Sequence, residues 1–238
     1  TITPEAVPSG AEPLSASFTL IVETPVAPIN VGDFFYSDGT WSTERDNTKT
    51  VIGIIFSNTP ATADSKLMTD YKEATHGLVV GVDEYYHIIG YLSNIGYGSD
   101  SGIAMRDRCD IFNEGVSNGY TNTFHLSNYS SERGDSGNKL DDKTTPVYWA
   151  ELYHPTRGVL ADVTTARPQG VSTWYIPSYN EMSLIRASLD KINASLNAAG
   201  GDTLSGVYWT STFKQYNTSG TLDATAGYKM SNGSWTKY

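Results

Sequence analysis

Basic residues and cysteines are scarce in this sequence. Its 238 residues include 16 Lys and Arg against 26 Asp and Glu, which gives a net charge of −10. Because proteins bind nucleic acids largely by neutralising phosphates with Lys and Arg, this composition argues against a nucleic-acid partner. Cys109 is the one cysteine, so no intrachain disulfide framework exists. We expect its thiol to be a small buried apolar group.

Long apolar runs are also lacking, since no stretch of about 18 apolar residues is present and no membrane-spanning helix is predicted. The chain begins at Thr1 rather than Met, which fits a processed export product. The sequence is rich instead in Tyr, with 16, and in Gly, with 22, alongside many Asn, Ser and Thr residues. Antibody paratopes use the same side chains because they stack and hydrogen-bond at little entropic cost.

Prolines divide the chain into two parts. Residues 1–30 contain Pro4, Pro8, Pro13, Pro25 and Pro28 around the alternating run at residues 17–23. Proline neither continues a helix nor donates to a central strand ladder, so we predict a Pro-rich linker with one edge strand here. Residues 31–238 are predicted to form the main domain. The run at 17–23 is also a candidate for assembly with a neighbouring molecule by strand addition.

Short apolar runs predict antiparallel strands in the first third of the main domain. Asp38-Gly39 is a turn signal between extended residues 31–37 and 40–42, which together read as a hairpin. Residues 50–56 and 77–82 are typical of buried strands. Residues 64–74, which join them, are either a short helix or a long loop.

The middle of the chain is irregular, because residues 92–145 are rich in Gly, Asn, Ser and Asp. Long irregular segments in compact domains usually serve as binding loops or lids. We predict a short helix over residues 119–129 and a second over residues 146–153.

The clearest helix signal begins at Ser178, where Ser178 and Glu181 have the spacing of a capping box. Apolar residues then recur three and four positions apart, and Gly200-Gly201 provides the stop. This apolar face contains Met182, Ile185, Leu189, Ile192 and Leu196. Beyond the helix we predict strands at residues 207–212, 226–230 and 235–238, with a turn at Asn232-Gly233.

Candidate catalytic residues do not form a supported site. Gly134-Asp135-Ser136-Gly137 overlaps the nucleophile motif of trypsin-like proteases, but His76 lies too close in sequence to serve across two barrels. We therefore interpret the string as a solvated turn. A hydrolase or oxidase that uses Asp135, Ser136 or Cys109 remains the rival class.

Metal-ligand spacing is likewise not found. His76, His87, His125 and His154 show no His-Glu-x-x-His pattern. The acidic groups lack the order of a calcium-binding loop, so we interpret them as solvated surface. They are Asp107, Asp110 and Glu114, and then Asp135, Asp141 and Asp142. We predict no catalytic residue, no metal and no cofactor.

Two motifs carry a family resemblance. Trp174-Tyr175-Ile176-Pro177-Ser178-Tyr179-Asn180-Glu181 is followed by Tyr208-Trp209-Thr210-Ser211-Thr212. They resemble the Trp-x-hydrophobic-Pro-x-x-x-Glu and Tyr-Trp-Ser/Thr-Ser-Thr signatures of C-type-lectin-like domains of the formylglycine-generating-enzyme type. That fold is also found in variable proteins of diversity-generating retroelements, and similar domains occur in bacterial surface and fimbrial-tip proteins.

The resemblance covers roughly residues 30–238 and implies an α+β fold with a small twisted antiparallel sheet, two or three helices and long loops. The enzymes of this family hold copper with a cysteine pair, and Cys109 alone does not provide one, so the oxidase activity is not carried over. Glu181 is expected to be a structural helix cap. Trp174, Tyr208 and Trp209 are expected to be core residues rather than platforms for sugars.

In the retroelement-diversified proteins that the chain resembles, variable residues follow the second motif and surround the last hairpin. We expect the corresponding residues here to lie on one exposed surface at the same end of the sheet, and to bind without metal. They are Phe213, Lys214, Gln215, Tyr216, Asn217, Tyr228, Lys229, Ser231, Asn232 and Trp235.

The expected function is therefore non-enzymatic recognition of a protein or glycan by an exported, adhesin-like domain. The alternatives are a phage tail-tip receptor-binding module and a structural subunit of a surface pilus.

Overall fold

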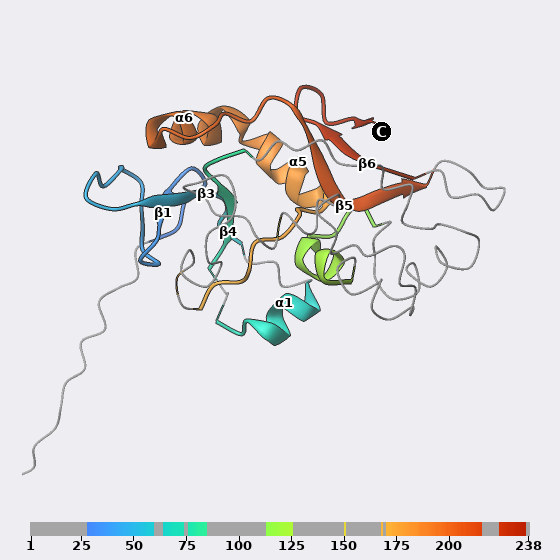
Figure 1. Ribbon diagram of the computed structural model, residues 1–238, viewed down its shortest axis with the longest axis horizontal. Coiled ribbons are helices and arrows are strands. Elements are labelled where there is room, and N and C mark those ends of the chain that lie inside the picture. Colours follow the sequence, from blue (N-terminus) through green and yellow to red (C-terminus); the bar gives the residue numbers. More distant parts are fainter. Residues whose placement is uncertain are drawn as a thin grey trace, which may run out of the picture.

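The computed structural model describes residues 28–59, 64–73, 76–84, 113–125, 150, 168, 170–215 and 224–236 (Figure 1). These residues form an α+β structure with two antiparallel sheets, and helix α5 lies between them in the view of Figure 1. The predicted α+β class is confirmed. The linker and the strand predicted within residues 1–30 lie outside the described residues, apart from residues 28–30.

The first sheet has the strand order β2-β1-β3-β4. It contains β1 (Phe34–Tyr36), β2 (Trp41–Ser42), β3 (Val51–Ser57) and β4 (Leu78–Gly81). The predicted hairpin is confirmed, with Gly39 between its strands at a φ of 83°, a region that glycine adopts without steric cost. Of the two strands predicted to be buried, β3 is buried along its whole length. Only Leu78 of β4 is buried, and the other three residues of that strand are half-buried.

The second sheet has the order β5-β6-β7. It contains β5 (Val207–Gln215), β6 (Ala224–Lys229) and β7 (Trp235–Thr236). Strand β5 is longer than the sequence predicted, because Lys214 and Gln215 pair with Thr225 and Ala224 beyond an irregularity in the register. Residues 213–215 therefore belong to a strand and not to a loop.

The helix that begins after Ser178 is confirmed in its cap and its buried face, but it is two helices rather than one. Helix α5 (Tyr179–Ala187) and helix α6 (Leu189–Ala199) are separated at Ser188, whose φ and ψ are −122° and 24°. Gly200 ends α6 at a φ of 81°. Leu189, next to the break, is only partly buried.

The core lies between these helices and the sheets. Met182, Ile185, Ile192 and Leu196 are buried as predicted, and α5 and α6 both contact β3. From the sheets and the turn after β6, the same cluster contains Phe34, Tyr36, Val51, Ile54, Phe56, Leu78, Tyr228 and Met230.

Two further helical segments lie on the other side of α5 from α6 in the view of Figure 1. Helix α1 (Ser65–Asp70) settles the open choice for residues 64–74 in favour of a helix, and Asp64 caps it by accepting a hydrogen bond from the Leu67 N–H. Residues 119–125 are helical, as is residue 150. The rest of the two helices predicted at 119–129 and 146–153 lies outside the described residues. In the part of the chain described, no helix is both long and apolar enough to cross a membrane.

Replacing Leu196 by Ala should lower the free energy of unfolding by about 2–5 kcal/mol, because the substitution leaves a cavity in a packed core. Leu196 is 0% exposed. Urea unfolding measures the change. Leu184→Ala is the matched control, since Leu184 is 38% exposed and its truncation should cost under about 1 kcal/mol. Equal losses in the two variants would contradict the described packing of α6.

Candidate functional site

The predicted binding residues do not form one surface. Tyr216 and Asn217 lie outside the described residues, and Phe213, Lys214 and Gln215 are on β5. Tyr228 is 2% exposed and belongs to the core, so its prediction as a ligand-binding residue is wrong. The cause is tertiary packing, because the Tyr228 ring lies edge-on to Tyr179 of α5, with centroids 5.0 Å apart.

The prediction that the residues after the second motif and those around the last hairpin lie at the same end of the sheet is also wrong. Gln215 pairs with Ala224 at one end of the β5–β6 ladder, and Val207 pairs with Lys229 at the other. Successive connections in an antiparallel meander leave from alternate ends. Gln215, at the end of β5, is therefore separated from the turn after Lys229 by the length of β5, about 27 Å at about 3.4 Å per residue.

Four of the predicted residues remain together around the β6–β7 turn. Ser231 and Asn232 are exposed, and Lys229 and Trp235 are half-buried. We call these four residues the turn surface. It combines a hydroxyl, an amide, an ammonium group and an indole, which bind ligands by hydrogen bonding and stacking.

The turn beneath this surface is held by its own side chain and by a backbone position suited to glycine. The Oδ1 atom of Asn232 accepts hydrogen bonds from the N–H and the hydroxyl of Ser234, at 3.0 and 2.7 Å. Gly233 has a φ of 68°, which L-residues with a side chain rarely adopt. These features give the turn one defined conformation.

Side chains of helix α5 also hold the turn in place. The Tyr179 hydroxyl donates to the Gly233 carbonyl at 2.9 Å, and the Arg186 Nε–H donates to the Met230 carbonyl at 3.2 Å. The Tyr179 ring is stacked against Trp235, with centroids 4.5 Å apart and an interplanar angle of 19°. The indole of Trp235 is thus held in place while part of it faces solvent.

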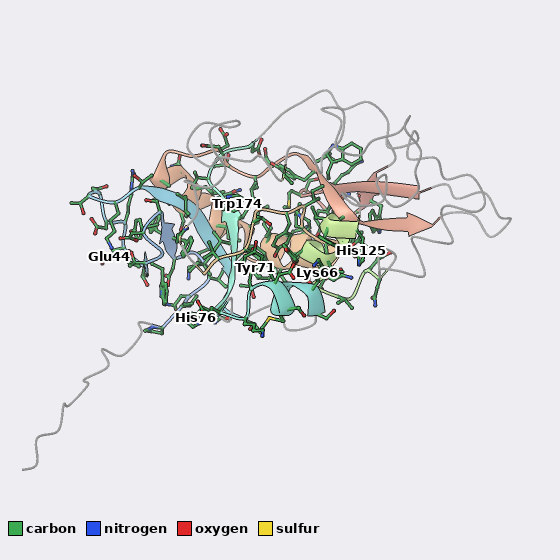
Figure 2. All side chains as sticks on the ribbon, turned by 60° about the horizontal axis from the view of Figure 1, so that its bottom comes forward. Glu44, Lys66, Tyr71, His76, His125 and Trp174 are labelled. Atoms are coloured by element: carbon green, nitrogen blue, oxygen red, sulfur yellow. The ribbon has the colours of Figure 1, made fainter. Side chains whose placement is uncertain are left out.

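A cleft that the sequence did not predict extends over the first sheet from the β1–β2 hairpin to β4. Its volume is about 450 Å³, and its lining includes Trp41, Glu73, His76 and Trp174 together with all of β4. Trp41 and His76 meet edge-on, with ring centroids 5.9 Å apart. Figure 2 shows His76 and Trp174 toward opposite ends of β4.

The cleft could not be inferred from sequence because its walls come from segments that are far apart in the chain. One of its aromatic residues, Trp174, did stand out in the sequence, because it belongs to the first family motif. Trp174, Tyr208 and Trp209 were expected in the core, but all three are half-buried. Tyr208 packs against the core, and its pKa is raised to about 12 by burial and by a hydrogen bond to Glu84.

Glu181 has the structural position that was predicted for it. Its carboxylate accepts hydrogen bonds from the Ser178 N–H at 2.6 Å and the Tyr175 hydroxyl at 3.2 Å, and the Ser178 Oγ accepts from the Glu181 N–H at 3.3 Å. The side chain is completely buried, and this desolvation raises its pKa to about 7. A Cβ at position 119 would clash with Oε2. The carboxylate is thus enclosed by protein.

Most residues of the rival catalytic and metal sites lie outside the described residues. These are His87, Asp107, Cys109, Asp110, Asp135, Ser136, Asp141, Asp142 and His154. His76, Glu114 and His125 are described. No group of three His, Cys, Asp or Glu side chains in the described ranges is arranged to hold a metal ion.

Comparison with known proteins identifies no relative. No family model matches the chain, and neither the curated proteins nor the solved structures give a match. The family resemblance of the two motifs therefore stays a prediction.

The difference in stability between the wild-type protein and Glu181→Gln should depend on pH. The folded-state pKa of Glu181 is raised from 4.5 to about 7, so between these values the folded state retains a proton that the unfolded state has lost. The contribution of this proton to the free energy of unfolding is therefore fully present below about pH 4.5. It falls as the pH rises to about 7, and above that pH it no longer changes. Across this pH range the contribution of Glu181 to the free energy of unfolding changes by about 3 kcal/mol.

Urea unfolding at intervals from pH 4 to 8 measures this dependence. Glutamine keeps a capping oxygen but does not titrate in this range, so the variant should gain stability relative to wild type as the pH rises. Glu44→Gln, at an exposed position, is the control and should follow the wild-type curve. Parallel curves for wild type and Glu181→Gln would contradict the raised pKa.

Proposed function

We propose that this chain is a non-enzymatic recognition domain that acts at the cell surface, outside the cell or on a virion tail, and binds a protein or glycan through the turn surface. The observation that carries the proposal is the fixed conformation of that surface. Its turn is bonded to α5 at the Gly233 and Met230 carbonyls, and Trp235 is stacked on Tyr179.

Rigid presentation favours binding because less conformational entropy is lost when the ligand arrives. A half-buried indole contributes a large contact area with few rotatable bonds, and neighbouring Ser and Asn side chains supply adaptable hydrogen bonds. Trp235, Ser231 and Asn232 provide this combination. The turn surface has only Lys229 as a charged member, so its recognition would depend more on stacking and hydrogen bonding than on charge.

The proposal includes a C-type-lectin-like fold, and the contact between the two family motifs supports it. The Ser211 N–H donates to the Pro177 carbonyl at 2.9 Å. The Tyr179 N–H donates to the Thr212 Oγ1 at 3.0 Å. The two motifs, which residues 182–207 separate in the chain, thus form one hydrogen-bonded unit at the start of α5.

Trp235→Ala should weaken ligand binding by about 2 kcal/mol or more, roughly 30-fold, as truncation of an aromatic hot spot does. Glycan and protein arrays would first identify the ligand, and calorimetric titration would then compare the variants. Trp41→Ala is the matched control, because Trp41 is another half-buried tryptophan but lines the cleft. Circular dichroism checks that both variants fold.

Ligand binding that survives Trp235→Ala and is lost in Trp41→Ala would place recognition in the cleft and overturn the proposed site. An absence of any ligand on both arrays would contradict the recognition function itself.

A further inference from the structure

Strand β4 lies at the edge of the first sheet, and its pairing with β3 determines which of its backbone groups face outward. It pairs with β3 in the register Ile54↔Val80 and Ile55↔Val79. The Ile55 N–H donates to the Asp33 carbonyl at 2.9 Å, and the Ile55 carbonyl accepts from the Gly32 N–H at 2.7 Å. Both polar groups of the Ile55 backbone are therefore directed toward β1 and away from β4.

Antiparallel pairs alternate between bonded and non-bonded positions. Because Ile55↔Val79 is a non-bonded pair, Val80 is the residue of β4 that bonds to β3. Val79 and Gly81 then direct their N–H and C=O groups to the outer edge, where no described residue forms a backbone hydrogen bond with them. An unpaired row of this kind is a template for another strand.

The cleft extends from the β1–β2 hairpin, at Gly39 and Trp41, across the sheet to β4 and its outer edge. Its lining includes Phe56 and Ile185, from the core side of the sheet, and Phe35 and Ile52, from the opposite side. The cavity therefore reaches β4 from both faces of the sheet, as well as extending beneath β1 and β3. Residues 170–175 and Pro177 form the wall facing β4, and Figure 1 shows this segment passing beside the strand.

We infer that residues 17–23 of the same molecule dock antiparallel to β4 in this cleft and add a fifth strand to the first sheet. The run reads Ser17-Phe18-Thr19-Leu20-Ile21-Val22-Glu23, in which Phe18, Leu20 and Val22 share one face of an extended chain. Those three side chains cover apolar cleft residues such as Ile52 and Val79, and the backbone of the run bonds to Val79 and Gly81.

Direction and length favour the chain's own segment over that of a second copy. Strands β1 and β4 are each antiparallel to β3, so both begin at the same end of the sheet. An antiparallel partner of β4 ends at that end, and Ile29, which precedes β1, lines the cleft. The distance across from the new strand to β1 is about 14 Å for three strand spacings.

Residues 24–28 are long enough to bridge this gap. The chain from Glu23 to Ile29 spans up to about 20 Å when extended. A tethered strand also has a high effective concentration at its acceptor, which a strand from a separate molecule lacks.

Amide hydrogen exchange of the full chain, followed by NMR, tests this inference. The amides of Val79 and Gly81 should be protected at every protein concentration, and deletion of residues 1–25 should speed their exchange by about 100-fold or more. Val80 is the internal control, since its amide bonds to β3 and should stay protected. Adding a peptide of residues 15–25 to the truncated protein should restore protection of Val79 and Gly81.

Leu20→Pro and Ile21→Pro provide a second test within the full-length chain. Adjacent residues of a strand direct their N–H groups to opposite edges, so one of the two prolines removes a donor to β4. That variant should lose protection at Val79 and Gly81 while the other retains more of it. If truncation also speeds the amide exchange of Val80, the comparison of these two variants tests the docking of residues 17–23 instead.

Three results would overturn the inference. One is rapid exchange of Val79 and Gly81 in the full chain, and another is protection that neither the deletion nor either proline changes. The third is protection that appears only on concentration together with a dimer in size-exclusion chromatography, because a second copy would then supply the strand.

Discussion

A buried carboxylate at the start of α5 is the interaction on which the rest of the structure depends. Glu181 is completely buried and accepts hydrogen bonds from the Ser178 N–H and the Tyr175 hydroxyl. A buried polar group that loses one partner incurs its full desolvation cost. Gly119 leaves the space that the carboxylate occupies. The segment before α5 and the helix at residues 119–125 must therefore approach each other closely for either to be stable.

Further polar contacts extend this frame to both sides. The Thr123 hydroxyl accepts from the Ile176 N–H at 3.0 Å, which attaches the segment before α5 to the helix at 119–125. Asp64 accepts from the Leu67 N–H and, through its other oxygen, from the Thr121 N–H, both at 3.0 Å. One carboxylate thus satisfies N–H groups in the first turns of two helices, where the backbone lacks partners and the helix dipole favours negative charge.

The features that the sequence predicted are those decided within a few residues. The capping box at Ser178, the turn at Gly39 and the buried spacing of Ile192 and Leu196 depend on local backbone geometry and helical period. The features it missed depend on distant partners. Strand β5 extends to Gln215 because β6 pairs with it, and Tyr228 is buried because α5 lies over it. The cleft likewise forms only where the first sheet and residues 170–177, which are far apart in the chain, pack near each other.

The position of α5 links the buried carboxylate to the turn surface. Glu181 sets the first turn of the helix, and Tyr179 and Arg186 of the same helix hold the Gly233 and Met230 carbonyls. Tyr179 is itself fixed at its N–H by Thr212. The conformation of the turn surface therefore depends on how α5 is packed as well as on the sequence of the turn itself.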